Sequence, residues 1–133
     1  MDWKLEVVVV PVADVDRAKH FYAGQVGFAV DHDTQAGEMR IVQLTPPGSG
    51  CSIVIGAGLS AMNPGSLQGL QLVVPDIEAA RTHLADQGVD VSAVQHFEGS
   101  ARVDGPGGRW NSFVFFSDPD GNAWTVQERP AET

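Results

Sequence analysis

The 133-residue chain, 43% of it apolar, is long enough for one domain with a hydrophobic core and too short for two independent ones. A net charge of −9 leaves no basic stripe to neutralise phosphates, which excludes a nucleic-acid partner, and no apolar run is long enough to span a membrane. No secretory signal is recognisable, and the single cysteine, Cys51, cannot form an intramolecular disulfide. We therefore expect a cytoplasmic protein without nucleic-acid or membrane partners.

The first half of the chain follows a pattern of one strand, one helix and three strands. The apolar run Val7–Val10 predicts a buried strand, which Pro11 closes. Asp14 is a good N-cap for the following helix, because a short carboxylate accepts hydrogen bonds from the exposed N–H groups of the first turn. Either Gly24 or Gly27 can end that helix. The helix has an apolar stripe of Val15, Ala18, Phe21 and Tyr22, and the further strands are expected at Phe28–His32, Met39–Leu44 and Cys51–Ile55.

The second half repeats this order. An apolar strand that begins near Gly69 ends before Asp76, which is again a good N-cap. The helix that follows carries an apolar stripe of Ile77, Ala80 and Leu84. The further strands are expected at Val91–His96, Asn111–Ser117 and Ala123–Gln127, with a turn at Asp118–Gly121.

The spacing of matching residues defines an internal repeat. The capping aspartates Asp14 and Asp76 lie 62 residues apart, and the turn glycines Gly48 and Gly121 lie 73 residues apart. The 11 extra residues of the second unit fall in Gly99–Arg109, which we expect to be a glycine-rich loop. One such unit leaves an apolar sheet face uncovered, so two units are expected to pair around a cleft. The sequence predicts a single domain over residues 1–133, with unit one at about 3–56, a linker at about 57–66 and unit two at about 67–129.

Two motifs resemble a known family: PVADVDRAKHFYAGQVGF at Pro11–Phe28 and FSDPDGNAW at Phe116–Trp124. With the doubled βαβββ order, they resemble the vicinal oxygen chelate superfamily of glyoxalases, bleomycin resistance proteins and extradiol dioxygenases. The resemblance covers essentially the whole chain. It implies an α+β fold in which two tandem βαβββ units form a curled mixed sheet around a cleft. It also implies a homodimer, in which a second chain completes the cleft.

Metal-using members of the superfamily place His, Glu or Gln ligands on the first and last strands of both units. The resemblance carries these positions over to Val7, Ser52, Gly69 and Thr125. Valine and glycine side chains have no donor atom, and neutral hydroxyls are poor ligands for a divalent ion. A register shift of two residues would instead offer Val9, Val54, Gln71 and Gln127. Two neutral amides still do not make a metal site, so we expect no bound metal and no other cofactor.

The strand faces turned to the expected cleft are then mostly apolar, with two amides, two hydroxyls and no charge. Such a surface suits an uncharged or aromatic small molecule that a few hydrogen bonds orient. Gln71 and Gln127 have an alternative interpretation as a self-satisfied amide pair. Arg109 and Trp110 end the glycine-rich stretch and would cover a ligand, unless that stretch is a surface loop. The candidate ligand-binding residues are Val7, Val9, Ser52, Val54, Gln71, Arg109, Trp110, Thr125 and Gln127.

His96 and Glu98 are the candidate catalytic residues. They are two positions apart, which places them on one face if their strand continues. A histidine near a carboxylate can act as a general base. The alternative is a polar strand end without chemistry, and no other residue suggests a catalytic role.

Three kinds of function fit these observations. The favoured one is a glyoxalase/bleomycin-resistance-like protein that binds a small, mostly uncharged hydrophobic or aromatic metabolite without a metal, for sequestration or resistance. The alternative is a superfamily enzyme, a lyase, an isomerase or a dioxygenase-like protein of glyoxalase I type, acting on a small oxygenated substrate. The third is an inert paralogue retained for assembly. Because an ene-diolate intermediate needs a Lewis acid or equivalent oxyanion stabilisation, the missing ligands favour binding over glyoxalase chemistry.

Overall fold

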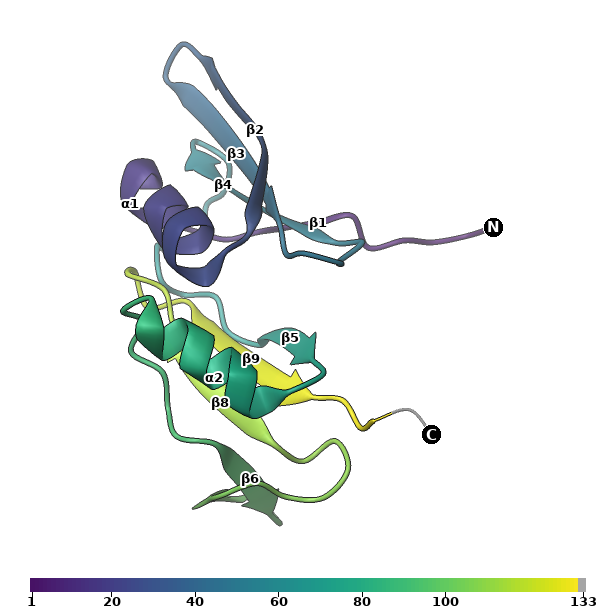
Figure 1. Cartoon of the computed structure of the whole chain (residues 1–133). Coiled ribbons are helices and arrows are strands. Elements are labelled where there is room, and N and C mark those ends of the chain that lie inside the picture. Colours follow the sequence, from purple (N-terminus) through teal and green to yellow (C-terminus); the bar gives the residue numbers. More distant parts are fainter. Residues whose placement is uncertain (132–133) are drawn as a thin grey trace. The chain divides into compact units, whose positions relative to one another are not determined.

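The computed structural model describes residues 1–131 and contains two mixed β-sheets with their helices (Figure 1). The chain divides into two units, which we describe separately. The first comprises Met1–Leu67 together with Asp118–Asn122, and the second comprises Gln68–Ser117 and the chain from Ala123 onward. The predicted α+β fold with two repeated units is confirmed. The segment Asp118–Asn122, which contains the turn predicted at Asp118–Gly121, makes most of its contacts with the first unit.

The first unit is built on a four-stranded sheet. Its elements are β1 (Val7–Val9), α1 (Val15–Lys19), the π-helical segment η1 (His20–Val26), β2 (Ala29–Ala36), β3 (Met39–Thr45) and β4 (Ser52–Ala57). The strand order is β1-β4-β3-β2, with β1 parallel to β4 and the other neighbours antiparallel. Because side chains alternate along a strand, four buried residues of β3 and β4 share one face: Val42, Leu44, Ile53 and Ile55. Ser52 and Val54 are buried on the other face of β4. The helical segment contributes Ala18, Phe21 and Tyr22 to the buried core.

The second unit is built on a five-stranded sheet. Its elements are β5 (Leu70–Val74), α2 (Ile77–Asp86), β6 (Gln95–Glu98), β7 (Ala101–Asp104), β8 (Phe113–Ser117) and β9 (Ala123–Glu128). The strand order is β5-β9-β8-β6-β7, and only β5 and β9 pair in parallel. Helix α2 contacts β8 and β9. Its buried Ile77 and Leu84 belong to a core with Val114, Phe116, Trp124 and Val126 of those strands.

The predicted helix caps are confirmed in both units. Asp14 Oδ1 accepts a hydrogen bond from the Arg17 N–H at 3.0 Å, and Asp76 Oδ1 accepts one from the Ala79 N–H at 3.1 Å. Gly27 ends the first helical segment in the left-handed conformation, with φ 100°. No helix among residues 1–131 has the length and apolarity needed to cross a bilayer.

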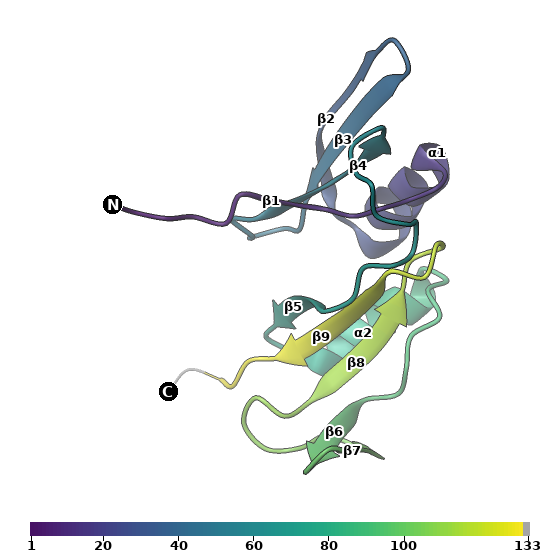
Figure 2. The same cartoon turned by 180° about the vertical axis from the view of Figure 1, so that it is seen from behind.

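The expected loop Gly99–Arg109 instead contains strand β7, and the expected strand Val91–His96 is replaced by β6 at Gln95–Glu98. Figure 2 shows β6 and β7 side by side. Their pairing ends at Glu98 opposite Ala101, which leaves a two-residue turn that begins with Gly99 at φ 62°. A glycine at this position permits the backbone twist that a tight hairpin needs. The extra residues of the second unit therefore supply one more strand.

The DPDGN motif forms a buried hydrogen-bonding centre in the first unit. Asp118 is 5% exposed, and its Oδ1 accepts from the backbone N–H groups of Asp120, Gly121 and Asn122 at 2.9–3.0 Å. Its Oδ2 accepts from the Tyr22 hydroxyl and from Asn122 Nδ2, both at 2.7 Å. The fully buried Asn122 also donates to the Pro11 carbonyl at 2.8 Å. These motif residues therefore hold the turn, the helical segment and the end of β1 together.

An ion-pair cluster fixes the β2–β3 hairpin to helix α1. Arg40 of β3 contacts Asp33 of β2 through two guanidinium nitrogens, at 2.8 and 3.0 Å, and Asp16 of α1 at 2.7 Å. Lys19 contacts Asp33 at 2.9 Å. Hydrogen bonds from Arg40 and Lys19 hold the pKa of Asp33 well below its usual range, so the cluster stays charged across the neutral range.

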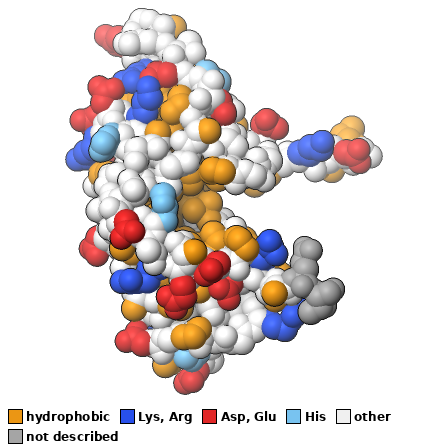
Figure 3. All heavy atoms as spheres, viewed as in Figure 1, with side chains coloured by type: hydrophobic (Ala, Val, Ile, Leu, Met, Phe, Trp, Pro, Cys, Tyr) orange, Lys and Arg blue, Asp and Glu red, His pale blue; other side chains and the backbone are white. Residues whose placement is uncertain are grey.

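The residues ahead of β1 form an extended segment that leaves the body of the first unit (Figures 1 and 3). Its apolar side chains alternate with charged ones. Met1, Trp3 and Leu5 are 100%, 86% and 71% exposed, and each is followed by a charged residue: Asp2, Lys4 and Glu6. Such alternation is typical of a strand that buries one face.

Candidate functional site

The sheet of the second unit has a polar and aromatic face opposite helix α2. Strand pairing places Gln71 opposite Thr125 and Thr125 opposite Phe115, and it places Val73 opposite Gln127 and Gln127 opposite Phe113. Paired residues point to the same side of a sheet, and these residues alternate with the core residues Trp124 and Val126. We call this surface the second-sheet face; its residues are Gln71, Val73, Phe113, Phe115, Thr125 and Gln127.

Three phenylalanines form a cluster at this face: Phe113 and Phe115 belong to it, and Phe97 of β6 lies next to them. The Phe97 and Phe113 ring centroids lie 5.3 Å apart in an edge-to-face arrangement, and the Phe113 and Phe115 rings stack at 6.1 Å. Phe97 completes the cluster at 6.3 Å from Phe115. All three rings are half-buried. These three rings therefore present surface that a planar ligand can contact.

A cation lies at the same cluster. The Arg102 guanidinium carbon sits 3.7 Å from the Phe115 ring centroid, and Gln95 Oε1 holds the guanidinium through hydrogen bonds of 2.8 and 3.1 Å. A guanidinium over an aromatic face is electrostatically attracted to the ring. The expectation of a face without charge therefore needs correction. Arg109, which the sequence predicts to cover a ligand, is exposed in the loop after β7.

The two candidate glutamines form a hydrogen-bonded pair, as the alternative interpretation held. Gln71 Nε2 donates to Gln127 Oε1 at 2.6 Å, and Gln127 Nε2 donates to the Trp110 carbonyl at 2.8 Å. Gln71 is exposed and Gln127 is half-buried. The Gln71 carbonyl oxygen and the second N–H of each amide are the groups of this hydrogen-bonded pair that remain for a ligand.

Trp110 has an unusual backbone. Its φ is 61°, it is the one non-glycine residue with positive φ among residues 1–131, and it is 48% exposed. A left-handed conformation costs a bulky residue about 1–2 kcal/mol, so other contacts must hold it. The Asn111 N–H donates to the Gly108 carbonyl at 3.1 Å, and Gln127 holds the Trp110 carbonyl. The indole therefore stands exposed on a constrained turn tied to the second-sheet face.

The strand faces of the first unit hold the other candidates. Val7 pairs directly with Ser52, and Val9 pairs with Val54. Val7 is 38% exposed, whereas Ser52 and Val54 are 7% and 9% exposed. The Ser52 hydroxyl lies 2.6 Å from the Thr45 hydroxyl, which already occupies it.

The side chains at the four predicted ligand positions do not fit a divalent metal ion. Opposite Thr125 stands Gln71 rather than Gly69, which precedes β5, so the second-unit pair is one amide and one hydroxyl. The first-unit pair is a valine and a hydroxyl. Within residues 1–131, no three His, Cys, Asp or Glu side chains are grouped as metal ligands would be. Divalent ions need more charged or more strongly donating ligands than these.

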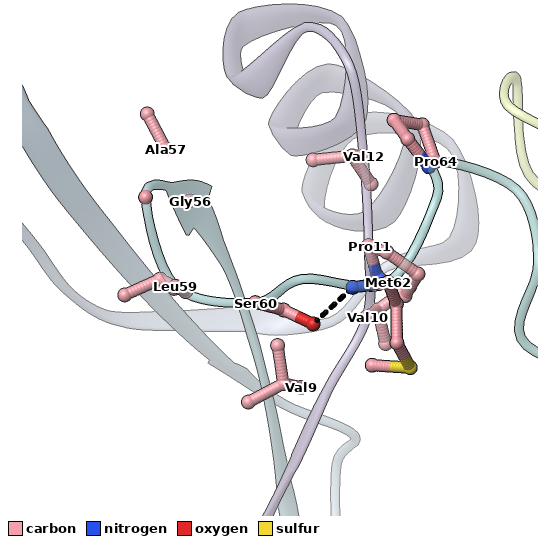
Figure 4. A pocket seen from close by; sticks show the side chains of 11 residues that line it. Val9, Val10, Pro11, Val12, Gly56, Ala57, Leu59, Ser60, Met62 and Pro64 are labelled. Atoms are coloured by element: carbon pink, nitrogen blue, oxygen red, sulfur yellow. Dashed lines mark hydrogen bonds between the residues drawn. The ribbon is translucent and has the colours of Figure 1, made fainter.

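A small cavity of about 180 Å³ lies in the first unit, between the end of β1 and the segment after β4 (Figure 4). Of the predicted ligand-binding residues only Val9 lines it. Position 56, which lines the cavity, accepts only glycine. A Cβ there would lie 2.0 Å from the Arg40 carbonyl oxygen and 2.7 Å from Leu59 Cδ1. Pockets for drug-sized ligands have about 300–1,000 Å³, so this cavity is too small for such a ligand.

The candidate catalytic residues His96 and Glu98 lie in contact with each other, but they point to the opposite side of β6 from the aromatic cluster. His96 Nε2 lies 3.3 Å from Glu98 Oε1, and His96 Nδ1 donates to the Gly105 carbonyl at 2.8 Å. Phe97, which lies between them in the sequence, faces the other way. The Gly105 carbonyl and then the Glu98 carboxylate raise the pKa of His96 above its ordinary value of 6.5.

This environment predicts a measurable titration. Because folding raises the pKa of His96, its protonated form contributes stability below about pH 6.5, and this contribution is lost as the pH rises through the raised pKa. An NMR titration of the His96 ring should give a pKa above 6.5 that Glu98→Gln lowers. Glu38→Gln changes an exposed carboxylate of the first unit and should leave the pKa of His96 unchanged. A His96 pKa at or below 6.5 in the parent protein would contradict the described contacts.

The comparisons with known proteins agree with this architecture. The model of the Glyoxalase/Bleomycin resistance protein/Dioxygenase superfamily matches residues 4–126. TnmS3, an antibiotic binding protein from Streptomyces sp. CB03234, has 33% identity over 96% of this chain and 97% of that one, with a TM-score of 0.78. A glyoxalase/bleomycin resistance protein from the same organism has 34% identity over 93% and 99%, with a TM-score of 0.74. A superfamily member from Sphaerobacter thermophilus DSM 20745 has 26% identity over 96% and 98%, with a TM-score of 0.76. The curated protein sequences give no match.

Proposed function

The chain belongs to the Glyoxalase/Bleomycin resistance protein/Dioxygenase superfamily, and from this premise we propose that it binds a small, largely planar aromatic or hydrophobic molecule without a metal. The second-sheet face, with Phe97 and Trp110 beside it, is the proposed contact surface. The role that follows is sequestration of a metabolite or resistance to an antibiotic.

The observation that carries this proposal is the half-buried cluster of Phe97, Phe113 and Phe115. Flat rings gain affinity from burial against aromatic surface, and a few fixed polar groups orient them. Gln71 and Gln127 supply such groups next to the rings. The similarity to the antibiotic binding protein TnmS3 supports the same class of function. His96 and Glu98 face away from the cluster, so the pair does not favour the enzymatic alternative.

Ligand binding should be detectable through tryptophan fluorescence. A screen of aromatic polyketides, quinones and short α-keto compounds is expected to show quenching that Trp110→Phe removes, because Trp110 is the exposed indole tied to this face. Gln71→Leu should weaken binding by about 1–3 kcal/mol if its amide contacts the ligand. Phe115→Leu should weaken it by about 0.5–1.5 kcal/mol through loss of ring contact.

Two controls accompany this screen. Gln35→Leu changes an exposed glutamine of the first unit and should leave affinity unchanged. Addition of a chelator should also leave it unchanged, because the proposed site uses no metal. Unaltered affinity in both Gln71→Leu and Phe115→Leu would place the site elsewhere, and binding that disappears with the chelator would refute the metal-free proposal.

We also propose that the protein acts as a homodimer. The alternating apolar side chains of the N-terminal segment and the short edge strand β1 support this proposal, because an unpaired edge with an apolar face is a surface for another strand. The partner subunit is a second copy of this chain.

A further inference from the structure

The side of the sheet that carries the second-sheet face continues onto β6 and β7. Arg102 of β7 stands opposite Phe97 of β6. Gln95 of β6 stands opposite Asp104 of β7 and Phe113 of β8. Paired residues point to the same side of a sheet, as do residues two positions apart on one strand. The pairing therefore places Arg102, Gln95 and Asp104 on the side of the aromatic cluster, all within the second unit.

Hydrogen bonds fix the direction of the Arg102 guanidinium. Asp104 Oδ1 accepts a hydrogen bond from Gln95 Nε2 at 2.9 Å. Because a carboxylate can only accept, the amide nitrogen of Gln95 is turned toward Asp104 and its oxygen toward Arg102. That oxygen accepts from Nε and Nη2 of the guanidinium. Gln95 and Asp104 together thus hold one edge of the guanidinium in place.

The guanidinium keeps donors that the described residues do not use. Both N–H groups of Nη1 and the second N–H of Nη2 remain after the contacts with Gln95. Within residues 1–131, no carboxylate forms an ion pair with Arg102. Its charge is instead met by a neutral amide and by the Phe115 ring, and the side chain is exposed. Arg102 is therefore a fixed cation with a free hydrogen-bonding edge.

Such an edge matches a carboxylate better than a single carbonyl oxygen. Two parallel N–H groups of a guanidinium fit the two oxygens of a carboxylate, and the opposite charges strengthen both hydrogen bonds. The guanidinium lies over Phe115, and the Phe97 and Phe113 rings lie next to it. An aromatic ligand that packs on these two rings brings a substituent of its own ring within reach of the free donors.

We propose that Arg102 is the specificity-determining residue of this surface, and that it binds a carboxylate carried by the aromatic ligand. Gln95 and Asp104 are positioning residues that fix the direction of the guanidinium. The ligand class is thereby narrowed to planar aromatic acids. This inference rests on the proposed binding of an aromatic molecule and adds the group by which that molecule is selected.

A matched pair of probes tests the inference. The compounds 2-naphthoate and 2-acetylnaphthalene have the same rings and nearly the same shape, and they differ in the charge and in the second oxygen. Calorimetry at neutral pH and low salt gives the ratio of their affinities. Arg102→Gln should shift this ratio by about tenfold toward 2-acetylnaphthalene, because the charged, two-pronged contact is lost. The affinity for 2-acetylnaphthalene itself should stay within about twofold or increase.

The net charge of −9 repels every anion, so the controls keep the change of charge the same. Arg129→Gln removes another exposed arginine of the second unit and should shift the ratio by less than about twofold. Arg102→Lys keeps the positive charge and loses the planar fork, so it should shift the ratio by about threefold.

The positioning role of Gln95 has its own variant. Gln95→Glu places a carboxylate beside Arg102, where it pairs with the guanidinium and competes with the ligand. The ratio should then shift toward 2-acetylnaphthalene at least as far as in Arg102→Gln, while the affinity for 2-acetylnaphthalene is kept. A Gln95 that serves packing alone would instead weaken both probes equally, which would contradict the positioning role.

The outcomes separate this inference from the proposed function. If both probes bind and Arg102→Gln shifts their ratio no further than Arg129→Gln, the role of Arg102 is refuted while aromatic binding stands. If the parent protein binds neither probe, aromatic binding itself fails in this form, and the role of Arg102 is overturned with it. Equal loss of both affinities in Arg102→Gln would show that Arg102 supports the ring cluster and does not select the substituent.

Discussion

Replacing Asp118 with alanine is expected to lower the free energy of unfolding by about 3–5 kcal/mol, a large part of the 5–15 kcal/mol of a typical domain. The Asp118 carboxylate accepts five hydrogen bonds, three from backbone N–H groups of its own turn and two from Tyr22 and Asn122. Alanine leaves all five donors without this acceptor. Tyr22 and Asn122 are fully buried, so water cannot readily replace it.

Urea unfolding followed by circular dichroism measures this effect. Tyr22→Phe removes one of the five hydrogen bonds with little change of shape and should cost about 1–2 kcal/mol. Asp90→Ala changes an exposed aspartate and should stay within about 0.5 kcal/mol of the parent. An Asp118→Ala protein whose stability falls no further than that of Asp90→Ala would mean that the turn does not hold the first unit together.

The features that the sequence predicted well are those determined by local chemistry. Asp14 and Asp76 cap their helices because an aspartate followed by an apolar helical stripe satisfies the first turn without any distant contact. Strand alternation likewise placed Gln71 and Gln127 on one face, where their amides meet. The turn Asp118–Gly121 was recognised for the same reason. The sequence did not predict that the Asp118 carboxylate is a buried hydrogen-bonding centre. Its partner Tyr22 lies 96 residues away in the sequence, and no local pattern indicates such a contact.

Features that depend on strand pairing were missed. In Phe113–Phe116 both faces of β8 are apolar, so alternation alone does not tell which phenylalanines face α2 and which form the exposed cluster. The β2–β3 pairing shifts register between Val30 and His32, so that Asp31 forms a β-bulge, and no local pattern fixes such a shift. Strand β7 was expected to be a loop, because four residues flanked by glycines give too short a periodic pattern.

The other large effect concerns assembly. Replacing Trp3 and Leu5 together with serine is expected to raise the dimer dissociation constant by at least about 100-fold. In a two-fold dimer each apolar side chain is buried twice, and burial of one such side chain contributes about 1.5–3 kcal/mol. The four burials together contribute about 6–12 kcal/mol. Half of that total, about 3–6 kcal/mol, exceeds the roughly 2.8 kcal/mol that corresponds to a hundredfold change.

The sequence of the segment suggests how two copies pair. If the segments align antiparallel about Leu5, then Trp3 stands opposite Val7 of the second copy and Lys4 stands opposite its Glu6. This register places apolar residues together on one face and opposite charges together on the other. The free edge of β1 continues the pairing, since only its other edge is occupied, by β4. The arrangement is isologous, so the same contacts form twice.

Analytical ultracentrifugation over a range of concentrations measures the effect. Met39→Ser removes an exposed apolar side chain from β3 and should leave the dissociation constant unchanged. Lys4→Gln should weaken the dimer only slightly, because exposed ion pairs contribute little. The net charge of −9 makes two copies repel, so added salt should strengthen an association that depends on apolar contacts. A dimer that survives the double substitution, or that weakens with salt, would show that a different surface joins the copies.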